Sequence, residues 1–441
     1  MTIRTLRRLT VCAMLLLTAC DSASHDNVEK WRNTQEGPSH LTKALNDSSV
    51  DLGVRAHAAE ALISLGEVDA VKPIVGQMSP EVRDAFFTQL TPRLWAVAKI
   101  VEADQAPVSK QIRAKDGLFE LRQLAEGPRR DEIDNDLLDW LTAGDFYDER
   151  SSAGDNTGEK IVRAIGIKAG PKMVQVGQDI LKNADQGKKG ILPLSKITLE
   201  GIAFTGAPEA VLFLIEVGEQ PQLQDGLQVQ AMTALYTAYI VTKDEPRPDI
   251  LGLVPHLDRL KKIAFSEDMP GENINIAYEL IAAVPAPACL QPLVYLATHR
   301  QFILRLRAID FGMRCGGPDA IVPLAEALPD DDYQQGIIEK YFVKKIDEEK
   351  LPRAAEAART LLGSRSWVGR FVGIEILARA GSKADVAKLR ALAGDKTKIR
   401  GYWGPQDDSA AGNKKGKSDV KTDPTIGQRA AQVADLLEKK S

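Results

Sequence analysis

The stretch HLTKALNDSSVDLGVRAHAAEALISLGEVDAVKPIV, residues 40–75, decides the fold. Leu41 and Leu45 are four residues apart and would share one face of a short helix, which a polar turn at 46–51 ends. Apolar residues then continue at helical spacing, at Val54, Ala58, Leu62 and Leu65. Gly66 can adopt a positive φ and end this second helix. The stretch therefore predicts a helix–turn–helix unit.

Units of the same plan recur along the chain. Their helix ends are marked by Gly170 before Pro171, Gly206 before Pro208, Gly316–Gly317 before Pro318, and Gly381. One helix pair cannot bury its apolar face alone, so repeated pairs stack on their neighbours. A repeat of about 35 residues predicts an all-α fold, a right-handed α-solenoid of about ten stacked helix pairs, or HEAT/armadillo-like superhelix. Unrelated amphipathic helices in an ordinary bundle are the alternative.

Small residues at mid-helix are a second sign of stacking, because they let helices in adjacent layers approach closely. These residues are Ala58, Ala59, Gly201, Ala308 and Gly373. Hydrophobic residues make up 44% of the chain and aromatic residues only 5%. This composition suits helices built on Ala and Leu better than sheets.

The segment from Val54 to Gly66 resembles the HEAT-like repeats of the family named after phycobilisome lyases. It shares a Val-Arg opening, small residues at mid-helix and a terminal Leu-Gly. In that family the opening arginine mostly pairs with an acidic residue of a neighbouring repeat, which the resemblance implies for Arg55 and Arg307. A positive patch for an acidic partner is the alternative for the cluster Arg300, Arg305, Arg307 and Arg314.

The N-terminus carries the pattern of an export signal. Arg4, Arg7 and Arg8 precede an apolar run at 11–18, which is far shorter than the ~18–20 apolar residues of a membrane-spanning helix but fits a secretory signal. Leu-Thr-Ala-Cys at 17–20 resembles the lipobox of bacterial lipoprotein precursors.

The resemblance to the lipobox implies that Cys20 is acylated and becomes the first residue of the mature protein. Asp21 resembles the inner-membrane retention signal of enteric bacteria, so we prefer that membrane. An ordinary secretory signal with a chance cysteine is the alternative.

The predicted organisation has five parts. These are a signal peptide at 1–19, a lipidated Cys20 with a polar tether at 20–36, the HEAT-like solenoid at 37–399, a polar loop insertion at 400–425, and a C-terminal closing helix at 426–441. At ~3.3–3.6 Å per residue, the tether could hold the solenoid up to about 50 Å from the membrane.

Signatures of catalysis or metal binding are weak. The five histidines, at 25, 40, 57, 256 and 299, include no pair at metal-ligand spacing, and His57 suits a structural role. The acidic run at 131–140 lacks the glycine and final glutamate of a calcium loop and suits a solvated helix face. Residues 411–418 match a relaxed phosphate-loop pattern without its strand and helix. We therefore predict no catalytic, cofactor-binding or metal-binding residues.

Cys289 and Cys315 are the other two cysteines beyond the signal segment. They lie in adjacent predicted repeats, and an extracytoplasmic location permits a disulfide. A bridge and two buried free thiols both remain open.

Partners follow from charge and architecture. The chain has 57 Lys+Arg and 61 Asp+Glu, a formal charge of −4, which gives no electrostatic reason to expect nucleic acid. A solenoid offers extended surfaces to protein segments. We therefore predict a non-catalytic protein-binding scaffold, anchored by lipid at the bacterial cell envelope and facing the periplasm or exterior. The alternatives are an enzyme or enzyme subunit related to the HEAT-like lyases, and a structural spacer.

Overall fold

The computed structural model describes residues 22–99, 109–144, 147–184, 193–220, 223, 225–330, 338–349, 353–401 and 424–439. The signal peptide, Cys20, Asp21 and the phosphate-loop-like residues 411–418 lie outside these ranges. The chain divides into two compact units, residues 1–187 with 193–210 and residues 188–192 with 211–441.

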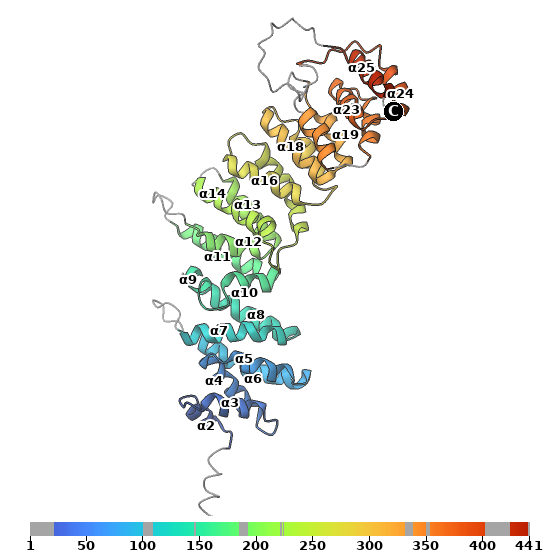
Figure 1. Ribbon diagram of the computed structural model, residues 1–441. Coiled ribbons are helices and arrows are strands. Elements are labelled where there is room, and N and C mark those ends of the chain that lie inside the picture. The colour runs from blue at the N-terminus through green and yellow to red at the C-terminus, as the bar shows by residue number, and fades with distance from the viewer. Residues whose placement is uncertain are drawn as a thin grey trace, which may run out of the picture. The chain divides into compact units, whose positions relative to one another are not determined.

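Unit 1 is a succession of short helices, each packed on its chain neighbours. In order they are α2 (His25–Trp31), α3 (Gly37–Asn46), α4 (Leu52–Leu65), α5 (Val68–Gly76), α6 (Pro80–Ala98), α7 (Ser109–Leu121), η1 (Arg122–Leu124), α8 (Gly127–Thr142), α9 (Tyr147–Ser151), α10 (Gly158–Ile165), η2 (Gly166–Ala169), α11 (Gly170–Asn183) and α12 (Lys196–Phe204). Helix α4 packs on α3, α6 and α7, so it lies at the centre of the first layers (Figure 1).

Unit 2 continues the same plan, with α13 (Pro208–Glu219) spanning the boundary. Its further elements are α14 (Asp225–Tyr236), η3 (Thr237–Val241), η4 (Ile250–His256), α15 (Leu257–Phe265), α16 (Gly271–Ala283), α17 (Leu290–Leu296), α18 (Phe302–Gly316), α19 (Pro318–Ala327), η5 (Ile338–Val343), α21 (Lys344–Glu349), α22 (Ala354–Leu361), α23 (Trp367–Ala380), η6 (Lys383–Asp385), α24 (Val386–Ala391) and α25 (Ile426–Lys439). Contacts run from α14 to α16 and from α16 to α18, while α15 pairs with α16 and α17 with α18. This layering of pairs is the predicted α-solenoid.

The glycine punctuation falls where the sequence places it. Gly66 has φ of 93° and ends α4, and Gly317 has φ of 53° between α18 and α19. Gly170 differs from the prediction, because α10 already ends at Ile165 and Gly170 begins α11.

Close packing explains the small residues at mid-helix. Ala58, Ala59 and Ala308 are fully buried. A Cβ added to Gly201 would lie 2.1 Å from the Tyr147 hydroxyl, and one added to Gly373 would lie 2.8 Å from the Ala358 carbonyl oxygen. Any larger side chain at these two glycines would push neighbouring helices apart.

A recurrent arginine joins the helices within pairs. Arg55, Arg150, Arg305 and Arg370 each occupy the fourth position of their helix. Each donates to a carbonyl at or just beyond the end of the preceding helix; the acceptors are Leu45 at 2.9 Å, Trp140 at 2.6 Å, His299 at 3.1 Å and Ser364 at 2.8 Å. A guanidinium there satisfies orphan carbonyls and complements the helix dipole.

These contacts correct two expectations about the arginines. Arg55 hydrogen-bonds a backbone carbonyl, whereas the resemblance implied an acidic partner in a neighbouring repeat. The arginine of unit 2 that matches Arg55 is Arg305, because Arg307 lies half a turn on and donates to the side chain of Asn275.

The predicted tether at 20–36 is also wrong in part, because helix α2 forms within it. Ser24 caps the helix by accepting from the Asn27 amide at 3.3 Å, and Val28 is fully buried. The folded chain therefore begins well before residue 37.

The closing helix lies where it is predicted. Helix α25 buries Ile426, Ala430, Val433, Ala434 and Leu437, and it packs on α23 and α24. The two ends of the predicted insertion meet, because the Ile399 amide donates to the Pro424 carbonyl at 2.9 Å and the Ile426 amide donates to the Thr397 carbonyl at 2.9 Å. Residues 402–423 between them lie outside the described ranges.

Candidate functional site

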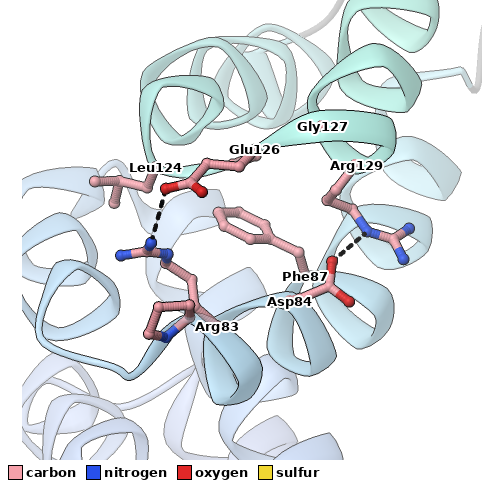
Figure 2. A pocket seen from close by; sticks show the side chains of 9 residues that line it. Arg83, Asp84, Phe87, Leu124, Glu126, Gly127 and Arg129 are labelled. Carbon is pink, nitrogen blue, oxygen red and sulfur yellow. Dashed lines mark hydrogen bonds and ion pairs between the residues drawn. The ribbon is translucent and has the colours of Figure 1, made fainter.

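A cavity of about 360 Å³ lies between the start of α6 and the start of α8, within unit 1 (Figure 2). Its lining residues are Pro80, Arg83, Asp84, Phe87, Leu124, Ala125, Glu126, Gly127 and Arg129. The volume falls within the usual range of about 300–1,000 Å³ for ligand pockets.

Local sequence sets the walls of this cavity. Ser79 caps α6 and Pro80 occupies its first turn, which directs Arg83 and Phe87, one helical turn apart, to the same side. The opposite wall runs from the end of η1 to the start of α8, where Gly127 has φ of 52°. That positive φ favours glycine at this bend.

The floor is apolar and the rim is charged. Phe87 is only 2% exposed, and its ring lies between two arginine–carboxylate pairs (Figure 2). Arg83 Nη2 lies 3.2 Å from Glu126 Oε1, and Arg129 Nε lies 3.7 Å from Asp84 Oδ1. Exposed ion pairs of this kind contribute only about 0–1 kcal/mol to stability, so they exchange partners at little cost.

The two partners of each pair differ in exposure. The side chains of Arg83 and Arg129 are 16% and 18% exposed, whereas those of Glu126 and Asp84 are 80% and 67% exposed. Arg129 is held further by donating to the Thr88 hydroxyl at 2.9 Å and to the carboxylate of Glu132 on its own helix. The arginines are thus fixed against the cavity while their carboxylates reach into solvent. An incoming carboxylate could replace either one.

The cavity lining includes no histidine, cysteine, serine or threonine, and its ionisable side chains are two arginines and two carboxylates. A smaller cavity of about 210 Å³ lies in unit 2 between α19 and α22. At its rim Arg353 pairs with Asp319 at 2.7 Å. Among the residues that the structure describes, no group of three or more His, Cys, Asp or Glu could hold a metal ion.

The other residues singled out in the sequence have structural partners. Arg300 pairs with Glu267, and Arg314 lies 3.3 Å from Asp310 and stacks over Phe311. The acidic run at 131–140 does not simply face solvent, because its Asp134 is buried and paired with Arg122.

Cys289 and Cys315 form a disulfide that links the start of α17 to the end of α18, with Cα atoms 6.6 Å apart. The chain thus closes a covalent loop across two adjacent helices of unit 2.

Burial raises the pKa of Asp136 on α8 to about 6, with a further contribution from the neighbouring Glu132 carboxylate. The Asp136 carboxyl lies on α8, the same helix that carries Arg129. This pKa shift is not predictable from sequence, because the burial of Asp136 depends on the packing of α8 against its neighbours.

Comparisons with known proteins give no family. No protein-family profile matches the sequence, and no curated protein matches it. An engineered protein of known crystal structure is 16% identical with a TM-score of 0.26, over 82% of this chain and 92% of its own. Human deoxyhypusine hydroxylase, solved with glycerol, is 14% identical with a TM-score of 0.23, over 81% of this chain and 99% of its own. Likenesses this distant carry no argument about function.

Within the described part of the chain, no helix is both long enough and apolar enough to cross a membrane.

Proposed function

We propose that this protein is a lipid-anchored helical-repeat scaffold of the bacterial cell envelope, which binds a protein partner without catalysis. Support for the anchor comes from the sequence, where the Leu-Thr-Ala-Cys motif ending at Cys20 follows a basic and an apolar segment. Two or more acyl chains would give stable membrane attachment. Support for binding comes from the helical-repeat fold, whose stacked layers expose extended surfaces.

The observation that carries the proposal is the α6–α8 cavity. Its apolar floor at Phe87 suits an apolar side chain of the partner, and its two fixed arginines suit carboxylates on either side of that side chain. The expected occupant is therefore an acidic protein segment with one apolar anchor. Anchors of this kind, in a pocket ringed by polar contacts, dominate binding at many protein interfaces.

The anchor is tested by metabolic labelling with a fatty-acid analogue. Wild-type protein should be labelled and recovered in the membrane fraction. Cys20→Ala should lose the label and either remain uncleaved or leave the membrane. Equal labelling of Cys20→Ala would contradict the anchor.

Binding is tested by chemical crosslinking in living cells followed by recovery of the anchored protein. Neutralising the cavity with Arg83→Gln and Arg129→Gln should remove the recovered partner. The matched control is Lys168→Gln with Lys182→Gln, which removes the same charge from exposed positions elsewhere in unit 1. If both double variants recover the partner equally, the cavity is not the docking site. If correctly anchored wild-type protein recovers no partner, the molecule is a spacer.

A further inference from the structure

The N-terminal helix α2 is docked on α4 by a chain of polar side chains. His25 Nδ1 lies 3.0 Å from His57 Nδ1, and His57 Nε2 lies 2.7 Å from Glu29 Oε1. The carboxylate can only accept, so His57 carries its proton on Nε2 and presents a free lone pair on Nδ1. His25 must then donate from its own Nδ1. Both hydrogen bonds, His25 to His57 and His57 to Glu29, form when the two imidazoles are neutral.

The charged groups around His57 do not favour a second positive charge on the histidine pair. Its side chain is 8% exposed, and the charged groups that face it are Glu29 from α2, Glu60 from its own helix and Arg93 from α6. Glu60 is in turn paired with Arg32, the residue that follows α2. Two carboxylates and two guanidiniums therefore already balance one another around the neutral histidines.

The histidine pair has the geometry of a direct hydrogen bond. The ring centroids are 5.1 Å apart while the two nitrogens are 3.0 Å apart, so the rings lie nearly end to end. A zinc ion with bonds of about 2.0–2.1 Å would need both lone pairs to converge beside that line. The geometry of the pair therefore suits a direct N–H···N hydrogen bond and not a shared metal ion.

We propose that α2 is a pH-sensitive latch, which opens when both His25 and His57 are protonated. A single added proton is tolerated, because one N–H can still point from either ring to the lone pair of the other. A second proton places N–H groups on both facing nitrogens, and the hydrogen bond becomes a repulsion between two cations.

The direction of the effect follows from proton linkage. Burial lowers the pKa of His57, which disfavours its charged form while α2 is docked. Release of α2 exposes the buried His57 ring to water, where a histidine side chain titrates near pH 6.5. The released state therefore binds more protons. The docking contribution is fully present above about pH 6.5 and is lost as the pH falls below that value.

The state of α2 would determine the largest distance between the membrane anchor and the docked helices. This consequence rests on the proposed lipidation of Cys20. With α2 docked, four residues separate Cys20 from the start of the helix and span at most about 14 Å. With α2 released and unwound, the linker runs to α3 at Gly37 and spans up to about 50 Å. Acidification would thus allow the solenoid to move away from its membrane.

The test is hydrogen–deuterium exchange of the full-length protein, extracted in detergent with a chelator present. Amides of residues 25–31 should lose about tenfold or more of their protection between pH 7.5 and 5.0, after correction for intrinsic exchange. Amides of α3 should keep theirs. Unchanged protection of α2 at pH 5.0 would overturn the proposal.

Two variants and a matched control identify the switch. His57→Gln keeps a donor for Glu29 but cannot titrate, and His25→Gln changes an exposed side chain whose loss the fold tolerates. Both should abolish the pH response. His40→Gln removes the ring stacked on Trp31 at 5.3 Å and should leave it intact. If His25→Gln and His57→Gln respond to pH as the wild type does, the latch does not depend on the pair.

Failure of the anchor and failure of the latch are separable. Cys20→Ala should show the same pH response in α2, because the hydrogen bonds that dock the helix run through His25, His57 and Glu29. A response confined to the acylated protein would overturn the histidine latch, whereas a missing fatty-acid label would overturn only the anchor.

Discussion

The first and last helices that the structure describes are held in different ways. Helix α2 has seven residues, buries Val28 and is docked by titratable side chains. Helix α25 has fourteen residues, buries an apolar stripe and joins Arg429 to Glu375 through two hydrogen bonds of 2.6 and 2.9 Å. The difference indicates that α25 unfolds with its unit, whereas α2 can detach locally.

The largest expected effect comes from breaking the buried pair of α25. Arg429 and Glu375 are 10% and 9% exposed, so Glu375→Ala removes the carboxylate that faces a buried guanidinium. Losses of this kind cost about 3–5 kcal/mol. Denaturant unfolding of unit 2, followed by exchange in α23 and α25, should show this loss.

Glu438→Ala is the matched control for that variant. Glu438 is an exposed carboxylate of α25 that pairs with Arg390 at 3.2 Å. Its removal should cost less than about 1 kcal/mol. Similar costs for Glu375→Ala and Glu438→Ala would contradict the view that the buried pair holds this end.

The disulfide of unit 2 is expected to have the next largest effect. Cys289 and Cys315 are 26 residues apart in sequence, and closing such a loop stabilises by about 3–4 kcal/mol in the chain-entropy model. The double variant Cys289→Ala with Cys315→Ala should lower the free energy of unfolding of unit 2 by that amount, measured by denaturant unfolding. Exchange in α2 should not change. If α2 loses protection as well, the two units do not behave separately.

The smallest effect at mild acidity should be at the C-terminal end. There, the side-chain hydrogen bond from Arg359, at 2.5 Å, holds the pKa of Asp385 below its ordinary value of 3.8. Stability from this group is present above about pH 4 and is lost only as the pH falls below that value. Peptides from residues 383–391 and 426–439 should therefore keep full protection at pH 5.0, where α2 has lost its own. Equal loss at both ends would mean that acid weakens the whole fold.

Local sequence signals predicted the repeat architecture well. Helix ends at Gly66, Gly206 and Gly317 are fixed by backbone conformation, which depends on the residue itself. The closing helix was predictable from its apolar spacing. Helix α2 was missed because its segment has almost no apolar periodicity, with Val28 as the buried residue.

The sites depended on contacts that sequence does not reveal. His57 reaches Glu29 across 28 positions and Arg83 reaches Glu126 across 43. The recurrent arginine was placed at Arg307 instead of Arg305, because the start of the helix, and so the arginine at its fourth position, could not be read from the sequence. Tertiary packing, within helix pairs or between them, decides all three.

The docking of a partner in the α6–α8 cavity is tested most directly by a photoreactive amino acid in place of Glu126, whose side chain is 80% exposed at the rim. Irradiation of living cells should attach one envelope protein at this position. The same residue placed at the exposed Lys182 should not attach it, and Arg83→Gln with Arg129→Gln should abolish the adduct. The same adduct from both positions, or none at Glu126 from anchored protein, would contradict the scaffold account.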